Sequence, residues 1–459
     1  AQAPCAETWA ALFERCAASE DGASMPGMSG ASAPALGGLL CAAAAGVAAG
    51  VLLERFRGRR GIAGLQSSSA VVKSGAEVRV AKTELQHLVA LCFEKVGVSP
   101  ENAALVAEVL VAADCRGVPS HGVNRAEMYC GEIQAGLIDS GANPRIAAET
   151  ESTANVDGQN GLGAVVSKFA MELCIAKAKA TGVGLVVCSR SNHFGIAGFW
   201  ADLALREGLI GFSFTNTSPF MVPTRAVQRA AGTNPISCYC PAGAADSFQL
   251  DMATTTVPVG KVEVCHRKGQ QIPLGWGVDR TGRSSTTDPT EVLLRGGGLT
   301  PLGGLEETAG YKGYGLNMMV EILCAVLSGC GRVGPDVPPW KVDRGVLADY
   351  GHCFLCIDPE QLLPGGHFQP ALAAYLERMR GLTPGDEALA VLVPGDPERA
   401  EEAQARSEGV RLNENVALGL RALARELGCS EALPGAIQNL SESVQAPKHA
   451  LGGSVTDGR

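Results

Sequence analysis

Apolar residues recur at helical spacing soon after residue 77. They lie three or four positions apart from 85 to 96 and stop at Gly97, which predicts an amphipathic helix. Thr83-Glu-Leu-Gln86 has the spacing of a capping box, so we expect this helix to begin there. Ser99-Pro100 then supplies a cap and a first-turn proline for a second helix, whose apolar face runs through 105–110.

The centre of the chain mixes helical and strand patterns. Residues 164–180 predict a helix that ends at Gly182, and the apolar run 184–188 predicts a buried strand after it. Residues 210–214 are a second strand candidate. Residues 314–327 predict a strongly apolar helix that is too short and too interrupted to cross a membrane. Helices that alternate with buried strands predict an α/β fold.

The two ends of the chain differ from this regular part, 77–430. Residues 35–53 carry no charge, the basic cluster 55–60 follows, and no acidic residue occurs from 55 to 76. This pattern predicts a targeting leader or a membrane anchor plus linker in 1–76, with membrane association through 35–53. A disordered alanine-rich segment fits the composition equally well. The protein would be organelle-targeted or membrane-anchored in the first case and cytoplasmic otherwise, and 431–459 reads as a disordered tail.

Composition and charge narrow the classes of partner. The chain has 459 residues, of which 46% are hydrophobic and 19% charged, as in a globular protein. Lys and Arg number 38 against 47 Asp and Glu, a formal charge of 38 − 47 = −9. This balance argues against a nucleic-acid partner, which needs a basic surface, but permits binding of a small anion by one local cation. The 58 glycines favour an α/β enzyme rich in tight turns.

Cysteine is frequent, with 16 residues at irregular spacing. Most lie in apolar runs, which predicts buried free thiols that act as small hydrophobes. Cys353 and Cys356 have redox spacing, but their run alternates like a strand, so their sulfurs should face opposite sides with Cα atoms roughly 10 Å apart. A thiol-redox protein is therefore a minor alternative. The sequence has no second cysteine pair with zinc spacing, so we do not expect a closed metal site.

The first candidate site is the run Asp114-Cys-Arg-Gly-Val-Pro-Ser-His-Gly-Val-Asn-Arg125. Ser120 should cap a helix, which would place His121, Arg125 and Tyr129 on one face. The guanidinium would grip a carboxylate while the imidazole exchanges a proton with a neighbouring oxygen, which suits a 2-oxo or 2-hydroxy acid. The structural alternative is a capped surface helix with a chance histidine.

A second candidate site is Ser191-Asn-His193-Phe-Gly195, directly after the predicted strand 184–188. The end of a buried strand is a common place for a functional group in α/β proteins. A turn whose histidine only caps backbone groups is at least as common.

The third set of candidate site residues consists of loops rich in small residues, whose backbone N–H groups can approach a phosphate closely. Lys312 adds a point charge to one of them, but most such loops are only turns. The loops are 215–219, 232–235, 251–255, 301–304, 310–315 and 394–398. Residues 329–334 match a dinucleotide fingerprint in their letters, yet they follow a predicted helix rather than a strand, and prolines at 335, 338 and 339 block the next helix. We reject this match as a cofactor site.

Taken in order, these segments resemble the malate/L-lactate dehydrogenase family of the second type. That family also contains ureidoglycolate dehydrogenase, diketogulonate reductase, sulfolactate dehydrogenase and cyclic-imine reductases. The resemblance runs from Val78 to Gly428 and includes 114–125, 156–163, 191–195, 232–235, 251–254, 301–304, 310–315, 351–352 and 394–398. It implies a non-Rossmann nicotinamide-binding α/β fold with a largely antiparallel sheet, a helical domain, and a homodimer.

The resemblance also implies roles for single residues. His121 matches a proton donor and His193 a proton acceptor, while Ser120, Arg125 and Asn192 match substrate contacts. The residues that match the NAD or NADP site are Thr217, Asp251, Met252, Ala253, Lys312, Pro394, Gly395 and Asp396. No metal is implied.

The expected activity is hydride transfer between NAD(P) and C2 of a small 2-hydroxy or 2-oxo acid such as malate or lactate. A cyclic-imine reductase would use the same arginine and histidine. A membrane-tethered homologue without catalysis, which only binds a dinucleotide or a partner, is the alternative from another class.

Overall fold

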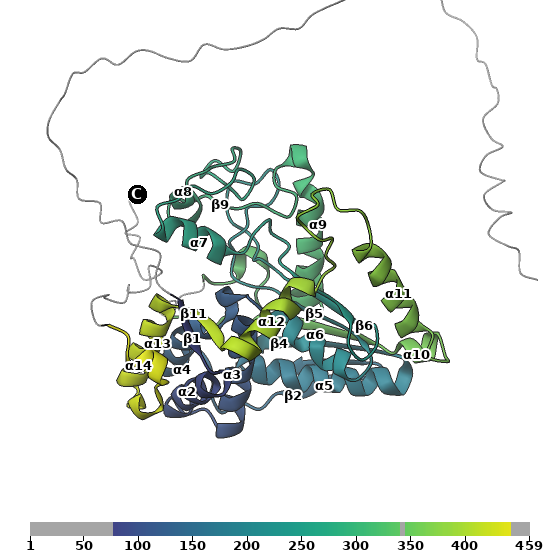
Figure 1. Ribbon diagram of the computed structural model, residues 1–459, viewed down its shortest axis with the longest axis horizontal. Coiled ribbons are helices and arrows are strands. Elements are labelled where there is room, and N and C mark those ends of the chain that lie inside the picture. The colour runs from purple at the N-terminus through teal and green to yellow at the C-terminus, as the bar shows by residue number, and fades with distance from the viewer. Residues whose placement is uncertain (1–76, 340–344, 442–459) are drawn as a thin grey trace, which may run out of the picture. The chain divides into compact units, whose positions relative to one another are not determined.

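The computed structural model describes residues 77–339 and 345–441, and the candidate leader in 1–76 lies outside them. Its centre is a seven-stranded sheet in the order β2-β3-β4-β10-β5-β6-β7 (Figure 1). Only β3 and β4 pair in parallel, and the other neighbours are antiparallel. The strands are β2 (Arg145–Glu149), β3 (Thr153–Asp157), β4 (Val183–Ser191), β5 (Ile210–Thr215), β6 (Ile236–Pro241), β7 (Ser247–Met252) and β10 (Tyr350–Ile357). The predicted mixed α/β fold with a largely antiparallel sheet is confirmed.

Two helices cover one face of this sheet. They are α5 (Gly163–Thr181) and α6 (Ala197–Arg206). Helix α5 ends as predicted, because Gly182 adopts the left-handed conformation at φ 85°. Gly184 lets α5 lie close to β4, since a Cβ there would meet the Cys174 carbonyl oxygen at 2.2 Å. Both predicted strands, 184–188 and 210–214, are present as β4 and β5.

A helical layer packs beside α5 and α6. Its helices are α2 (Lys82–Lys95), α3 (Pro100–Cys115), α4 (Ala126–Gln134), α13 (Glu414–Glu426) and α14 (Gly435–Gln438), with the paired strands β1 (Glu77–Val80) and β11 (Val410–Asn413). One apolar cluster joins this layer to α5 and to the inner face of β4, so the predicted helical domain has no core of its own. Ser99 caps α3 as predicted, with its hydroxyl accepting from Asn102 N.

Two expectations about element ends are wrong. Helix α2 begins at Lys82 after Ala81, and no side chain caps it, so Thr83 lies inside the first turn rather than in a capping box. The described part of the predicted tail packs on the domain: α14 buries Ile437 completely, and Arg421 donates to the carbonyl oxygens of Gln438 and Leu440. These contacts come from α13, which the local composition of 431–440 does not reveal.

The opposite face of the sheet packs against α9 (Gly310–Glu321) and the π-helical turn Ile322–Val326 that continues it. Cys353 belongs to this cluster, whereas Cys356 lies in the main core on the other side of β10. The two sulfurs therefore face opposite sides, as predicted, and the thiol-redox alternative is excluded. Within the described part of the chain, no helix is long and apolar enough to cross a membrane.

Three further groups of elements surround the sheet. Helices α7 (Val259–Arg267) and α8 (Pro289–Leu293) pack with the short pair β8 (Gly277–Val278) and β9 (Gly298–Leu299) around a separate small cluster. Helices α10 (Pro359–Leu362) and α11 (Phe368–Arg380) follow β10, and α12 (Asp396–Glu408) leads back to β11. Residues 329–334 follow the π-helical turn and lead into a single 3₁₀ turn, so the rejected fingerprint does lack the strand and helix that a dinucleotide site needs.

Candidate active site

The segment that carries His121 and Arg125 is shaped by Asp114 at the end of α3. The buried Asp114 carboxylate accepts the Val123 N–H at 2.8 Å, and a Cβ on Gly122 would meet the Asp114 carboxylate at 2.1 Å. The chain therefore turns tightly at Gly122 and forms two 3₁₀ turns, Pro119–His121 and Val123–Arg125, before α4 begins. Burial raises the pKa of Asp114 to about 8, although the Val123 N–H opposes this.

The predicted cap at Ser120 is wrong, because the helix begins six residues later, at Ala126. Ser120 instead lies within its own 3₁₀ turn, with its hydroxyl 2.9 Å from His121 Nδ1. Its carbonyl oxygen accepts Arg125 Nε–H at 2.7 Å, which fixes the base of the guanidinium. The backbone at the start of α7 lies close by, since a Cβ on Gly260 would be 3.0 Å from the Ser120 Cβ. Ser120 thus orients both His121 and Arg125.

The fold brings the two predicted histidines together. The rings of His121 and His193 stack with centroids 5.5 Å apart and planes 24° apart. Tyr129 of α4 reaches the same place, with its hydroxyl 2.5 Å from His193 Nδ1. We call His121, Arg125, Tyr129 and His193 the histidine cluster. The sequence predicted one helix face for Tyr129 and His121, but α4 does not extend back to His121, and sequence reasoning assigned Tyr129 no role.

Burial and positive charge keep the two histidines of the cluster neutral. Burial, and then the Arg125 charge, lowers the pKa of His121 to about 3. Burial also lowers the pKa of His193 well below its usual value, and His121 and Arg125 add to this effect. Burial raises the pKa of Tyr129. At neutral pH the histidine cluster therefore contains two uncharged imidazoles beside one fixed cation, an arrangement suited to a substrate carboxylate next to a proton-exchanging group.

A third histidine, His352, contacts the loop Ser191–Gly195, which we call the His193 loop. His352 of β10 is completely buried, with Nδ1 2.8 Å from the Thr215 hydroxyl and Nε2 2.7 Å from the Ser191 hydroxyl. Its ring stacks on Phe194 with centroids 4.7 Å apart, directly beside His193. Sequence reasoning noted His352 only as part of the resemblance, and its position between β4 and β5 could not be derived from spacing.

Asn192, which the resemblance implies as a substrate contact, is held by its amide nitrogen, while its Oδ1 atom is buried with no hydrogen-bond partner within the described residues. Its side chain is 2% exposed, and its amide nitrogen donates to the carbonyl oxygens of Gly161 at 2.9 Å and Asn160 at 3.2 Å. The residue therefore ties the 158–163 loop to the His193 loop.

A buried polar network joins the loops that the family resemblance assigns to the cofactor. Glu321 of α9 accepts from the side-chain amides of Asn216 and Asn234, and also from Gly334 N–H. Asn234 in turn accepts Thr217 N–H at 3.1 Å. Asn317, one turn before Glu321, donates to the Gly232 carbonyl oxygen and to the Thr254 hydroxyl, each at 2.9 Å. Helix α9 thus fixes the loops that carry Thr217 and the segment Asp251–Ala253.

Lys312 lies in the first turn of α9 and is exposed. It belongs to the helix that organises these loops, but no contact joins it to Thr217 or Asp251 within the described residues.

Asp251 lies between the region of the His193 loop and a cavity lined by predicted cofactor residues. Its carboxylate accepts Gly198 N–H at 2.7 Å, at the start of α6, three residues after the His193 loop ends. On its other side Asp251 lines a cavity of about 270 Å³. We call this the acidic cavity; its lining also includes Glu398, Gln249, Leu250, Pro397 and the segment 392–395. The structure therefore places two of the predicted cofactor segments, Asp251 and Pro394–Gly395, around one cavity.

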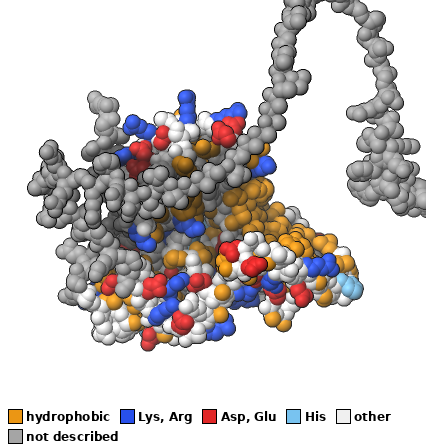
Figure 2. Space-filling model, turned by 45° about the horizontal axis from the view of Figure 1, so that its top comes forward, with side chains coloured by type: hydrophobic (Ala, Val, Ile, Leu, Met, Phe, Trp, Pro, Cys, Tyr) orange, Lys and Arg blue, Asp and Glu red, His pale blue; other side chains and the backbone are white. Residues whose placement is uncertain are grey.

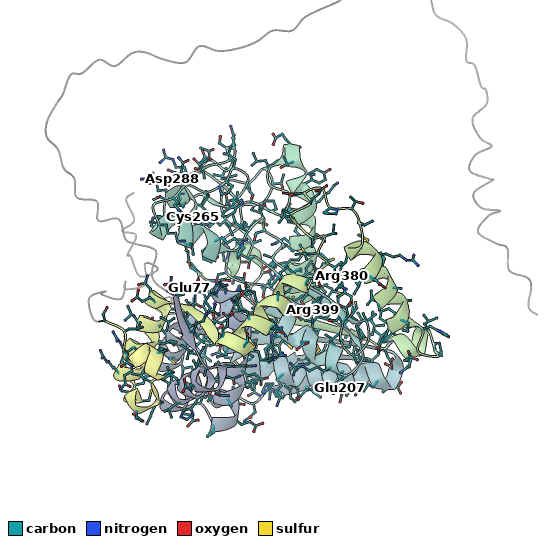
Figure 3. All side chains as sticks on the ribbon, in the orientation of Figure 1. Glu77, Glu207, Cys265, Asp288, Arg380 and Arg399 are labelled. Atoms are coloured by element: carbon teal, nitrogen blue, oxygen red, sulfur yellow. The ribbon has the colours of Figure 1, made fainter. Side chains whose placement is uncertain are left out.

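Asp396 stands beside the acidic cavity but is already engaged. Arg380 of α11 and Arg399 of α12 both pair with its carboxylate, Arg380 at 2.8 Å. Both arginines also contact Asp246, and they lie near one another in Figure 3. This network stabilises the Asp396 carboxylate, whose pKa falls to about 2 as the arginines and Val393 N–H outweigh burial. Asp396 thus fixes the start of α12 rather than offering a free carboxylate.

The lining of the acidic cavity has groups that are compatible with part of a dinucleotide. Its wall combines the backbone of Pro394 and Gly395, where a Cβ would meet Gln249 at 2.8 Å, with two carboxylates that can accept hydrogen bonds from ribose hydroxyl groups. Asp251, Pro394 and Gly395 would hold this part, and Thr217, Met252 and Ala253 would extend the surface along the loops that α9 fixes. In the described part of the chain, no three His, Cys, Asp or Glu side chains are grouped to hold a metal ion.

Comparison with known proteins identifies the family. The malate/L-lactate dehydrogenase family model matches residues 80–421. Malate dehydrogenase of Pyrococcus horikoshii is 38% identical over 352 residues, which cover 76% of this chain and 96% of that protein. Its solved structure superposes with a TM-score of 0.71 at 35% identity, covering 79% of this chain and 98% of that one.

Two other relatives have different names. L-sulfolactate dehydrogenase of Methanocaldococcus jannaschii is 36% identical, over 73% of this chain and 93% of that protein. The Δ¹-pyrroline-2-carboxylate/Δ¹-piperideine-2-carboxylate reductase of Pseudomonas putida is 34% identical, over 75% of this chain and 97% of that protein. These matches confirm the resemblance and the expectation of an oxidoreductase. The chain therefore belongs to the malate/L-lactate dehydrogenase family.

Proposed function

We propose that the protein interconverts a small 2-hydroxy acid and its 2-oxo acid with a nicotinamide cofactor. The observation that carries this proposal is the meeting of His121, His193 and Arg125 at one site, although the two histidines come from different segments of the chain. Family membership supports the same reaction class. The presence of all three side chains argues against a homologue without catalysis.

Each residue of the histidine cluster has a part in this reaction. Arg125 pairs with the substrate carboxylate and so sets the direction in which C2 and its oxygen point. A neutral histidine next to C2 takes the hydroxyl proton during oxidation and returns it during reduction. The nicotinamide cofactor, when bound, accepts or donates the hydride at C2. The apolar side chains around Tyr129 keep water from the buried side of the cluster.

A cyclic imino acid is the second candidate substrate. It carries the same carboxylate beside a C=N bond, so Arg125 and a histidine would serve both substrates equally. The Pseudomonas putida relative, named for such imines, is the observation that favours keeping this candidate.

We propose NAD as the preferred cofactor. Asp251 and Glu398 line the acidic cavity, and the neighbouring Arg380 and Arg399 are both paired with Asp246 and Asp396. Carboxylates accept hydrogen bonds from a ribose but repel a 2′-phosphate, which usually needs an arginine partner. We expect kcat/KM to be at least about tenfold higher with NADH than with NADPH. This ratio corresponds to the free energy of roughly one charge–charge interaction. An equal or higher value with NADPH would contradict this preference.

We propose that the open side of the sheet forms a homodimer interface. Helix α9 and its π-helical turn expose Met319, Ile322 and Val326, at 41%, 52% and 57%. Sheet residues such as Phe212 and Ile236 are only half-buried beside them. Figure 2 shows hydrophobic side chains gathered on one side of the molecule, and patches of this kind mark interaction surfaces. Light scattering of the wild type and of Val326→Asp tests this: the wild type should be a dimer and the variant a monomer.

The leader in 1–76 is a proposal that rests on its sequence. We propose that it directs or anchors the protein at an organelle membrane through 35–53. Fusing residues 1–76 to a fluorescent protein tests this, because a diffuse cytoplasmic signal would contradict it.

The reaction itself is tested by oxidation of NADH and NADPH with the full chain. The substrates are pyruvate, oxaloacetate, sulfopyruvate, diketogulonate and a cyclic imine. A saturable rate with a 2-oxo acid is expected and would identify substrate and cofactor together. Oxidation with the imine alone would favour the second candidate, and a chain that binds neither dinucleotide would contradict the proposal.

A further inference from the structure

The contacts of His193 distinguish its two ring nitrogens. Nδ1 lies 2.5 Å from the Tyr129 hydroxyl and 3.3 Å from Gly195 N, on the buried side of the ring. From this geometry we propose that Tyr129 is a positioning residue: with Gly195 N–H it holds neutral His193 with the proton on Nε2, so that this histidine donates a hydrogen bond to the C2 oxygen of the substrate. The hydrogen bond to the substrate rests on the proposed function, whereas the tautomer of His193 does not.

The backbone amide of Gly195 decides the direction of these hydrogen bonds. A hydroxyl can donate or accept, so the contact with Tyr129 alone would allow either tautomer. A backbone N–H can only donate, and a proton on Nδ1 would point at it. Nδ1 is therefore the acceptor, and the single proton of the neutral ring is on Nε2. The Tyr129 hydroxyl then donates the shorter of two converging hydrogen bonds.

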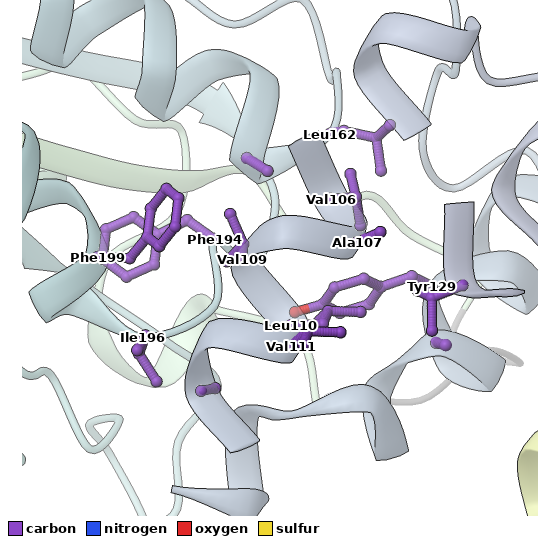
Figure 4. Packing of buried hydrophobic residues seen from close by; sticks show 14 of the residues in the cluster. Val106, Ala107, Val109, Leu110, Val111, Tyr129, Leu162, Phe194, Ile196 and Phe199 are labelled. Carbon is purple, nitrogen blue, oxygen red and sulfur yellow. The ribbon is translucent and has the colours of Figure 1, made fainter. Parts of the chain in front are cut away.

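The surroundings of Tyr129 keep its hydroxyl in the donor role. Its side chain is 5% exposed and lies among apolar residues such as Leu110 and Val111 (Figure 4). Its ring also meets Phe93, with centroids 6.4 Å apart. Burial raises the pKa of Tyr129, so the hydroxyl keeps its proton, and burial lowers the pKa of His193, so the ring stays neutral. Both groups are thus in the protonation states that the inferred hydrogen bond needs.

The second histidine differs. Among the described residues, His121 Nδ1 hydrogen-bonds to the Ser120 hydroxyl, which can donate or accept, so this contact allows the ring proton on either nitrogen. A ring that can change tautomer is suited to exchanging a proton, while a ring held in one tautomer is suited to donating a fixed hydrogen bond. The cluster therefore divides the work: His193 orients and polarises the C2 oxygen, and His121 exchanges the proton.

The tautomer is measured directly by nitrogen NMR of the full chain labelled with ¹⁵N in the histidine rings. The His193 signals are those lost in His193→Gln. We expect a bare Nδ1 and a protonated Nε2 for His193 in the wild type, and a weaker preference in Tyr129→Phe. A proton on Nδ1 in the wild type would overturn the inference, whether or not the chain is active on any 2-oxo acid.

Kinetics test the consequence for the substrate. Tyr129→Phe should lower kcat about tenfold, the effect of losing one buried hydrogen bond, with the KM for NADH unchanged. Tyr350→Phe is the matched control, because it removes a buried hydroxyl that contacts the Ser218 hydroxyl at 2.7 Å. Equal kcat values in the two variants would overturn the positioning role. Absence of turnover in the wild type would instead count against the proposed function, and the NMR result would still decide the tautomer.

Discussion

The histidine cluster and the acidic cavity hold polar groups in opposite ways. In the histidine cluster, neutral side chains are buried or half-buried and held by direct hydrogen bonds, and Arg125 is the cation that the cluster itself contributes. Around the acidic cavity, charged side chains remain partly exposed and are fixed by paired arginines and aspartates. Buried neutral groups respond strongly to the loss of one partner, whereas exposed ion pairs respond weakly. Substitutions in the first region should therefore have larger effects than substitutions in the second.

The largest effect is expected from Arg125→Gln. Glutamine removes the charge that would pair with the substrate carboxylate, so kcat/KM for a 2-oxo acid should fall about 100-fold, mainly through KM. Steady-state kinetics with varied 2-oxo acid measure this. Arg190→Gln is the control, because Arg190 pairs with Asp157 at 2.9 Å, its side chain is 54% exposed, and it should change kcat/KM less than twofold, roughly the effect of a surface pair. Equal losses of kcat/KM in both variants would contradict a role of Arg125 in substrate binding.

Glu321→Gln tests the buried network between the two regions. The amide would place a donor among three donors, so the free energy of unfolding should fall by about 2 kcal/mol and the KM for NADH should rise. Urea denaturation and NADH titration measure these changes. Glu306→Gln breaks an exposed pair with Arg225 and should leave the free energy of unfolding nearly unchanged. A normal KM for NADH in Glu321→Gln would separate this network from cofactor binding.

The neutral histidines predict how stability depends on pH. Burial lowers the pKa of His352, like that of His121, to about 3 in the folded protein. A histidine in the unfolded chain has a pKa of about 6.5. Below about pH 6.5 the unfolded chain therefore binds protons that the folded protein does not, so stability is full above this pH and is lost progressively towards about pH 3.

Urea denaturation between about pH 6.5 and 5 measures this loss. His352→Gln removes one of the groups and should reduce the slope by about 1 kcal/mol per pH unit. An unchanged slope would mean that His352 takes up its proton in the folded protein as readily as in the unfolded chain.

The smallest effect is expected from Arg380→Met at the edge of the acidic cavity. The Arg380 side chain is 30% exposed, and Arg399 still pairs with both Asp246 and Asp396 in its absence. We expect a loss of at most about 1 kcal/mol in the free energy of unfolding and little change in kcat. A larger loss than that of Glu321→Gln would reverse the contrast between buried and exposed polar groups.

Local patterns predicted the elements whose causes are local. The buried run of β4, the end of α5 at Gly182 and the capped start of α3 at Ser99 all follow from neighbouring residues. The opposite faces of Cys353 and Cys356 follow from the two-residue period of a strand.

Features that depend on distant contacts could not be predicted. The turns at Ser120 are set by Asp114 and Gly122, and the order of residues 431–440 is set by packing on α13. The link between Asn216 and Glu321 joins residues 105 positions apart. The same holds for the site, where His121, His193 and Arg125 were recognised as motifs but their common location, and the parts of Tyr129 and His352, appear only in three dimensions.

The most direct test of the proposed mechanism is the effect of His121→Ala on turnover and on cofactor binding. We propose that proton exchange belongs to the histidine cluster, whereas most of the proposed cofactor contacts come from separate loops. We therefore expect kcat to fall about 100-fold, as for loss of a general acid or base, while the dissociation constant for NADH stays within about twofold of the wild type, roughly the scatter expected for a distant site. Turnover close to that of the wild type would contradict this mechanism and would move the proton exchange to His193.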